Sequence, residues 1–133
     1  MSMSQAYRRT NTVVFLINYH FVFCPTRRRK VLTGTIEKEV RKLLRQKASE
    51  LGCEILALEI MSDHVHLFLN CPPTLSPSDA MFWLKGYSSK ILREKYPTLK
   101  RMPSMWTRSF FVSTAGNVSS QTIQKYIAEQ KTR

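Results

Sequence analysis

The sequence predicts an α+β fold in which a four-stranded antiparallel sheet packs against helices on one face. Apolar patterns with strand-like and helix-like periods alternate along the chain. The 133 residues are enough for one layered core, so residues 1–133 are expected to form a single domain. No apolar run reaches the roughly 18 residues that a membrane-spanning helix needs.

The first half of the chain is expected to supply one strand and one helix. Residues 11–23, NTVVFLINYHFVF, are rich in β-branched and aromatic side chains, which is typical of a long buried strand. A basic turn, CPTRRRK, comes next at residues 24–30. Apolar residues then recur at helical spacing from Ile36 to Leu51, and Gly52 stands where a helix commonly ends.

The next elements are a hairpin and a second helix. Residues 54–61, EILALEIM, and residues 64–70, HVHLFLN, are separated by only Ser62 and Asp63, so the two runs are predicted to pair. A helix over about residues 79–96 comes after a proline-rich loop. It is expected to stop before Pro97, because the residue that precedes a proline disfavours helical geometry.

The last two elements complete the topology. Residues 106–114, WTRSFFVST, are predicted to form the fourth strand, which Gly116 and Asn117 end. Residues 118–130 are predicted to form a final helix capped by Ser119 or Ser120. The order β-α-β-β-α-β is the split pattern of a ferredoxin-like sandwich, in which the first and third strands are central. The final helix has no required place in that sandwich.

The charge of the chain indicates a polyanionic partner. There are 21 Lys and Arg residues against 9 Asp and Glu residues, for a formal net charge of +12. Nucleic acid is the first candidate and an acidic membrane surface the second. The N-terminus has no secretory signal pattern, so we expect a cytoplasmic protein. Three widely spaced cysteines with no CxxC motif are expected to be buried, reduced thiols.

The stretch MSDHVHLFL at residues 61–69 carries two histidines on a predicted strand. Successive side chains of a strand point to opposite faces, so His64 and His66 share one face. Their rings would then lie within reach of one metal ion. The alternative interpretation is a pair of partly buried histidines that form hydrogen bonds on the sheet.

Two residues of the predicted final helix extend this pattern. Tyr126 and Gln130 are four residues apart and therefore share a helix face. Taken singly, they are a packing tyrosine and a solvated glutamine. Together with two imidazoles, they describe covalent catalysis in which a phenol oxygen attacks phosphorus beside a metal ion. Gln130 could supply an amide oxygen, and a mixed imidazole–oxygen site suits Mn²⁺, with Mg²⁺ possible.

MSDHVHLFL and QKYIAEQ, in this order and in a chain of this length, resemble the small single-tyrosine HUH transposases of bacterial and archaeal insertion sequences. HUH stands for His-hydrophobic-His. The resemblance covers nearly the whole chain. The other segments that carry it are YHFVF at 19–23, RRKVL at 28–32, LKGYSSKILREKYP at 84–97 and WTRSFFVSTAG at 106–116.

The resemblance implies roles for individual residues. His64, His66 and Gln130 would bind Mg²⁺ or Mn²⁺, and Tyr126 would be the nucleophile. Asp63 is a turn former that could orient a ligand histidine. Cations of the basic turn and of the second helix would contact DNA: Arg27, Arg28, Arg29, Lys30, Lys85, Lys90 and Arg93. The chain departs from the family at Ser62, which replaces a common proline, and at Arg27, which replaces a common aromatic residue.

The resemblance also implies an activity, a substrate and an assembly. Members of this family bind single-stranded DNA with subterminal hairpins. They cleave one strand, hold its 5′ end as a phosphotyrosine and release a 3′-OH that later rejoins strands. They work as homodimers in which the tyrosine helix of one subunit completes the metal site of the other.

Three other functions fit the sequence less well. A ferredoxin-like RNA-binding or single-stranded-DNA-binding module would leave the two mid-strand histidines unexplained, and the RNA-recognition signature is absent. A two-histidine RNA phosphodiesterase needs two H-x-[ST] motifs, whereas Phe21 and Val22 come after His20. Replication initiators and relaxases share the HUH chemistry but are larger. His20 is expected to be a core residue or a support for a ligand.

Overall fold

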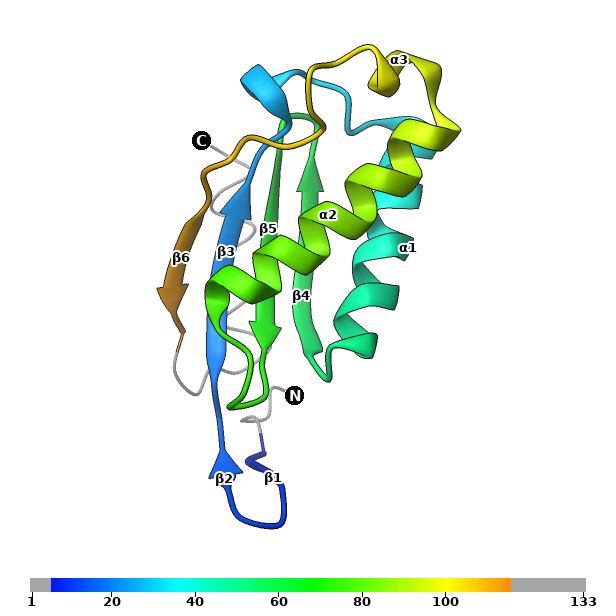
Figure 1. Cartoon of the computed structure of the whole chain (residues 1–133). Helices are drawn as coiled ribbons and strands as arrows, with labels where there is room; N and C mark the ends of the chain where they lie inside the picture. Colours follow the sequence, from blue (N-terminus) through cyan, green and yellow to red (C-terminus); the bar gives the residue numbers. More distant parts are fainter. Residues whose placement is uncertain (1–5, 116–133) are drawn as a thin grey trace.

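The computed structural model describes residues 6–115 of the chain (Figure 1). The predicted final helix at 118–130, with Tyr126 and Gln130, lies outside the described residues, as does the break at Gly116 and Asn117.

The main sheet has four strands in the order β4-β5-β3-β6, and every neighbouring pair is antiparallel. The strands are β3 (Asn18–Phe23), β4 (Glu54–Met61), β5 (His64–Asn70) and β6 (Phe111–Thr114). The first and third of them, β3 and β5, are central, as in a ferredoxin-like sandwich (Figure 1). The predicted α+β class and sheet topology are confirmed.

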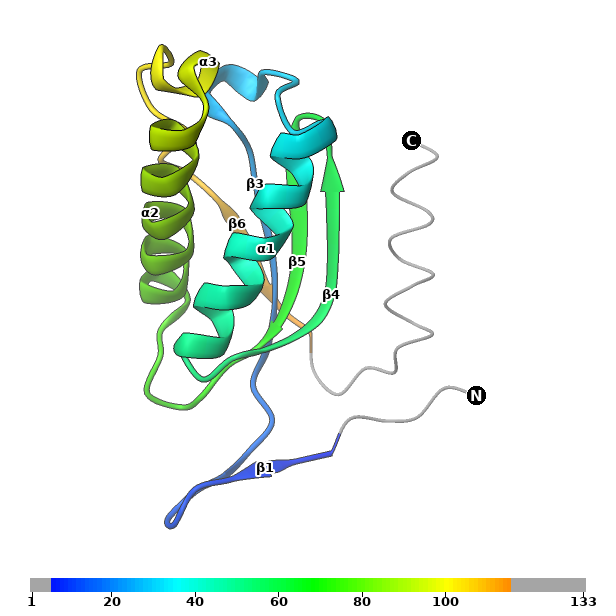
Figure 2. The same cartoon turned by 90° about the vertical axis from the view of Figure 1, so that its right-hand side faces the viewer.

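Two long helices cover the same face of this sheet (Figure 2). They are α1 (Gly34–Glu50) and α2 (Pro77–Lys95). The start of α2 is capped because the Ser76 hydroxyl accepts a hydrogen bond from the Asp79 N–H at 3.0 Å. The helix ends before a proline, as predicted, but that proline opens a short helix that the sequence did not indicate, α3 (Pro97–Lys100).

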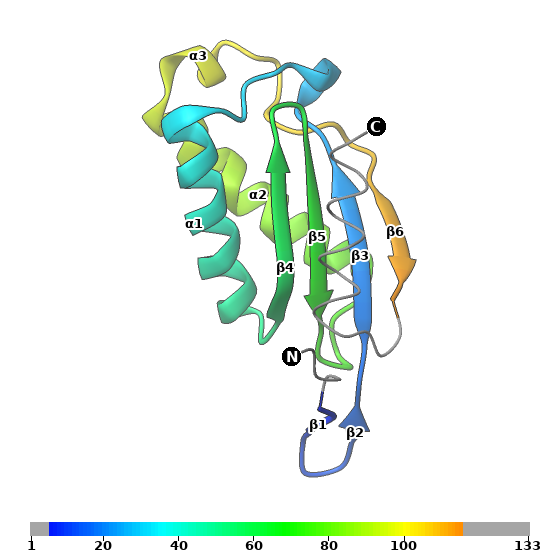
Figure 3. The ribbon, with the colours of Figure 1, turned by 180° about the vertical axis from the view of Figure 1, so that it is seen from behind.

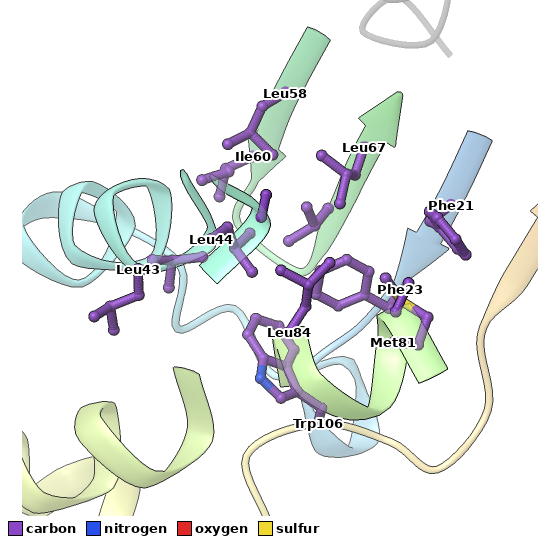
Figure 4. Packing of buried hydrophobic residues seen from close by; sticks show 14 of the residues in the cluster. Phe21, Phe23, Leu43, Leu44, Leu58, Ile60, Leu67, Met81, Leu84 and Trp106 are labelled. Atoms are coloured by element: carbon purple, nitrogen blue, oxygen red, sulfur yellow. The ribbon is translucent and has the colours of Figure 1, made fainter. Parts of the chain in front are cut away.

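The core lies between the helices and one face of the sheet. Alternate residues of β5, namely Val65, Leu67 and Leu69, are completely buried there. Side chains from α2 and from the segment before β6 pack against these strand residues, and they include Leu84 and Trp106 (Figure 4). Because the period of a strand is two, the residues between them face away from the core.

The predicted strand at 11–23 is two strands. β2 (Val14–Phe15) leaves the main sheet and forms a small hairpin with β1 (Arg8–Arg9), whereas β3 begins at Asn18. Asn18 pairs with Asn70, the last residue of β5. Two prolines lie just beyond it, at 72–73, and prolines have no N–H to donate, so the ladder cannot continue.

The predicted strand at 106–114 is also shorter, because only Phe111–Thr114 joins the sheet. Trp106 forms an isolated bridge with Pro25, and its indole is buried. Between Trp106 and β6, the carbonyls of Thr107 and Ser109 accept hydrogen bonds from the Lys85 ammonium instead of from a neighbouring strand.

The cysteines are free thiols, as predicted: Cys53 and Cys71 are buried, and Cys24 is half-buried. Among the helices of residues 6–115, none has both the length and the apolar character required to cross a membrane.

A buried hydrogen bond between α2 and the segment before β6 gives a test of this packing. The Trp106 Nε1–H donates to the Ser88 hydroxyl at 3.0 Å, and both residues are buried. Ser88→Ala should lower the free energy of unfolding by about 1–3 kcal/mol, because the indole N–H loses its acceptor. Urea unfolding followed by tryptophan fluorescence would measure this change.

The control is Ser89→Ala, one residue further along α2. Ser89 is only half-buried, so the free energy of unfolding of this variant should stay within about 0.5 kcal/mol of the wild-type value. Equal losses in the two variants would contradict the assignment.

Candidate functional site

His64 and His66 lie on the central strand β5, on the sheet face opposite the core. Figure 3 shows the sheet from the side away from α1 and α2, with β5 between β4 and β3. His64 is the first residue of the strand, directly after the two-residue turn of the β4–β5 hairpin. The centroids of the two imidazole rings are 4.9 Å apart, and the ring planes are inclined by 82°. His64 is partly exposed and His66 is buried. The prediction that the two histidines share a face is confirmed.

The turn residue Asp63 holds one nitrogen of His64. Asp63 Oδ1 accepts a hydrogen bond from His64 Nδ1 at 2.7 Å, and Asp63 Oδ2 accepts one from Arg28 Nη2 at 3.1 Å. The pKa of the Asp63 carboxyl lies below its usual value, mainly because His64 donates to it and further because of the Arg28 charge. Since an ionised carboxylate only accepts hydrogen bonds, the hydrogen of a neutral His64 is on Nδ1 and the lone pair is on Nε2.

His66 has a histidine as its neighbour. His66 Nδ1 and His20 Nε2 are 3.2 Å apart in a buried hydrogen bond. His20 lies on β3, opposite Phe68 in the register, so it is a diagonal neighbour of His66 on the same face. Burial, with a smaller effect of the His66 charge, lowers the pKa of His20 to about 4. The pKa of His66 is also lowered, first by burial and then by the charge of His64.

His20 and His66 are therefore neutral at neutral pH, and the neutral imidazole is the form that binds metal ions. Among the described residues, no group of three or more His, Cys, Asp or Glu side chains could hold a metal ion. His64 and His66 can supply two ligands, so a metal ion here needs donors from elsewhere. Gln130, the predicted third ligand, and Tyr126, the predicted nucleophile, lie outside the described residues. Two adjacent imidazoles, each with Nδ1 in a hydrogen bond, fit the nitrogen part of such a site.

The basic turn at residues 24–30 lies next to the turn of the β4–β5 hairpin, which precedes His64. Arg27, Arg28, Arg29 and Lys30 are all exposed. Besides the Arg28–Asp63 ion pair, the Leu32 N–H donates to the carbonyl of Ser62, in the hairpin turn, at 3.0 Å. The segment therefore presents four cations beside the candidate metal ligands.

Two residues of this turn have unusual backbone geometry. Arg27 and Arg28 have φ angles of 58° and 51°, in the left-handed region that non-glycine residues seldom adopt. Strained backbone of this kind is concentrated at functional sites, where the surrounding structure holds it in place.

The predicted DNA contacts from α2 have different surroundings. Lys90 is exposed. Lys85 is half-buried, its ammonium donates to backbone carbonyls before β6, and burial lowers its pKa. Arg93 Nη2 donates to the Met102 carbonyl at 2.8 Å. Lys85 and Arg93 thus have roles inside the protein, and their contact with DNA stays a prediction.

Two contacts of the site were not predicted from the sequence. One is the ion pair between Arg28 and Asp63. The other is the contact of His20 with His66, since the sequence indicated His20 only as a core residue or a support for an unspecified ligand. The spacing that relates His20 to His66 is set by the pairing of β3 and β5, so no local pattern reveals it. The basic turn and the hairpin turn also meet only in the folded chain.

Comparisons with known proteins agree on one family. The family model described as "Transposase IS200 like" matches residues 13–130. The ISDra2 transposase TnpA of Deinococcus radiodurans is 33% identical over 120 residues, which cover 88% of this chain and 86% of that protein. The transposase for insertion sequence element IS200 of Salmonella typhimurium is 37% identical over 115 residues, which cover 84% of this chain and 75% of that protein.

Two solved structures are similar to this one. A crystal structure described as a transposase from Deinococcus radiodurans R1 has a TM-score of 0.76 and 31% identity, over 92% of this chain and 97% of that chain. A REP-associated tyrosine transposase bound to a REP hairpin has a TM-score of 0.58 and 15% identity, over 92% of this chain and 68% of that chain. The second likeness concerns the fold alone.

The buried histidines predict loss of stability in mild acid. The pKa of His20 is about 4 in the folded protein and about 6.5 in an unfolded chain, so the unfolded state takes up the proton first. The free energy of unfolding should therefore fall as the pH drops from 6.5 to 4, by about 3 kcal/mol from His20, and this contribution should level off below pH 4. Urea unfolding in chelator at several pH values measures it. In His20→Phe, which cannot titrate, the loss over that interval should be smaller by about the same amount. An unchanged acid loss in this variant would contradict the assignment.

Proposed function

The chain belongs to the IS200-like transposase family, and we propose that it cuts and rejoins single-stranded DNA at the ends of an insertion sequence. The observation that carries this proposal is the pair His64 and His66 on one sheet face, each with Nδ1 in a hydrogen bond, beside an exposed basic turn. Exposed cations beside the pair can neutralise phosphates, so this surrounding fits a site for phosphodiesters better than a purely structural histidine pair.

His64 and His66 would hold Mn²⁺ or Mg²⁺, with Gln130 as the third protein ligand. A bound divalent ion polarises the scissile phosphodiester and neutralises the charge that develops on it. The residues of the chain have separate tasks. Asp63 keeps the lone pair of a neutral His64 on Nε2, and Arg28 donates a hydrogen bond to the other oxygen of the Asp63 carboxylate.

Tyr126 would be the nucleophile. Its oxygen bonds to phosphorus as the phenol gives up its proton, and the 3′ oxygen leaves with a proton as a free hydroxyl. The 5′ end is then held as a phosphotyrosine. Attack by a 3′-OH on that phosphotyrosine reverses the step and rejoins two strands, so the bond energy is conserved and no nucleotide hydrolysis is needed.

The DNA substrate would be a hairpin with single-stranded flanks. Arg27, Arg29 and Lys30 are exposed cations that can neutralise phosphates, so binding should weaken as the salt concentration rises. One structural relative was solved with a REP hairpin bound, which supports a hairpin as the ligand class. The proposed assembly is a homodimer in which each subunit completes the other's site with Tyr126 and Gln130.

Replacing Tyr126 tests the covalent step. Tyr126→Phe should abolish a covalent protein–DNA adduct and leave DNA affinity nearly unchanged, because the phenol oxygen is the nucleophile and the cations supply the affinity. The assay incubates the protein with single-stranded element ends and Mn²⁺ and detects the adduct on a denaturing gel. His64→Ala is the companion variant and should lose metal-dependent cleavage. An undiminished adduct in Tyr126→Phe would assign the chemistry to another residue. Cleavage by His64→Ala in chelator would exclude a role for the metal ion.

Mixed dimers test whether the site is shared. One chain carries His64→Ala and His66→Ala, the other carries Tyr126→Phe, and each is expected to be inactive alone. In a heterodimer, the histidines of the second chain and the tyrosine of the first should form one complete site. With differently sized tags, the DNA should be attached only to the chain that lacks histidines. Mixed dimers that form and remain inactive would instead indicate a site complete within each subunit.

A further inference from the structure

We propose that His20 is a positioning residue for the metal site: its Nε2 accepts a hydrogen bond from His66 Nδ1, which keeps the lone pair of His66 on Nε2 for the metal ion. This inference rests on the proposed metal site and names a residue that the motif does not contain. The two nitrogens are 3.2 Å apart, and both residues are 5% exposed. Strands β3 and β5, which carry the two residues, lie side by side at the centre of the sheet (Figure 3).

One hydrogen atom lies between His66 Nδ1 and His20 Nε2. Whether His66 can bind a metal ion depends on which of these two nitrogens carries that hydrogen. If it belongs to His66 Nδ1, the lone pair of a neutral His66 is on Nε2, where a metal ion can bind. If it belongs to His20 Nε2, then His66 Nδ1 is the acceptor and His66 Nε2 carries the other hydrogen, so neither nitrogen of His66 can bind a metal ion. Only the first arrangement makes His66 a ligand.

The same logic holds for His64, with a different acceptor. Asp63 Oδ1 accepts from His64 Nδ1, so both ligand histidines have a hydrogen-bond partner at the same ring nitrogen. Carboxylates, backbone carbonyls and water are the usual partners of metal-binding histidines. At His66 the partner is a neutral imidazole. When it accepts, it favours the tautomer of His66 with the hydrogen on Nδ1, and it adds no negative charge to a buried position.

Packing keeps the acceptor in place. The His20 ring stacks on Phe68 with the ring centroids 4.3 Å apart and the planes inclined by 5°, and Phe111 contacts it edge-on at 5.8 Å. His20 also lies on a central strand between Tyr19 and Phe21, which point the other way and pack in the core. An aromatic side chain that only filled this space would make the same stacking contacts, so the competing explanation is packing alone.

Two substitutions at this position separate the explanations. His20→Phe keeps a ring against Phe68 and removes the acceptor. His20→Gln removes the ring and restores an acceptor oxygen at a similar reach. Loss of a hydrogen-bond partner of this kind weakens metal binding by about 10–100-fold. We therefore expect weaker Mn²⁺ binding by about that factor in His20→Phe, and affinity within a few-fold of wild type in His20→Gln.

The measurements use the full-length protein without DNA. Titration with Mn²⁺ alone, followed by electron paramagnetic resonance of the free ion, gives the affinity, and thermal unfolding confirms that each variant is folded. Imidazole ¹⁵N NMR of the metal-free protein reports the tautomer. We expect the hydrogen of His66 on Nδ1 in wild type and His20→Gln, and a mixture of tautomers in His20→Phe.

The outcomes distinguish this inference from the proposed function. Undiminished Mn²⁺ binding in folded His20→Phe, with binding lost in His64→Ala, would overturn the positioning role and leave the metal site intact. A His66 hydrogen on Nε2 in the wild-type protein would also overturn it. Wild-type protein that binds no Mn²⁺ would overturn the metal site itself, and this inference with it.

Discussion

The side chains of β5 alternate between two environments, and both the core and the candidate site depend on this alternation. Val65, Leu67 and Leu69 are buried under the helices, so the register of the strand cannot shift by one residue without exposing them. The same constraint fixes His64 and His66 on the opposite face. The free energy that stabilises the fold thereby also holds the two imidazoles in place, and β3 and β4 on either side limit any movement of the strand.

A chain of polar contacts links the basic surface to the histidines. Arg28 donates to Asp63, and Asp63 accepts from His64, so one carboxylate connects the basic turn to a candidate metal ligand. Arg27 and Arg28, in this basic turn, have left-handed backbone. At the buried end of the histidine pair, His20 contacts Nδ1 of His66, as Asp63 contacts Nδ1 of His64 at the exposed end. The charged contact lies at the exposed end of the pair and the neutral one at the buried end, as expected from the cost of burying a charge.

Some of the cationic side chains of α2 form hydrogen bonds within the protein and are therefore less available to bind DNA. Lys85 donates to backbone carbonyls in the segment between Trp106 and β6, in place of hydrogen bonds that a strand would have made, and Arg93 donates to the Met102 carbonyl. Their place in a helix with many cations made them candidates for DNA contact, and local sequence does not distinguish a structural cation from an exposed one. Burial distinguishes the two kinds of cation, because the surrounding chain removes water from a structural cation and leaves an exposed one in solvent.

The sequence by itself determined the elements that depend on local periodicity. The apolar spacing of α1 and α2, the two-residue connection between β4 and β5, and the shared face of His64 and His66 all depend on neighbours within a few positions. Tertiary structure decided the features that depend on pairing over long separations. The strand before Asn18 leaves the sheet because its partner strand ends at Asn70, Trp106 turns inward to Ser88, and His20 meets His66 only through the β3–β5 register. These contacts join residues 18 to 52 positions apart, and their geometry exists only after the sheet has formed.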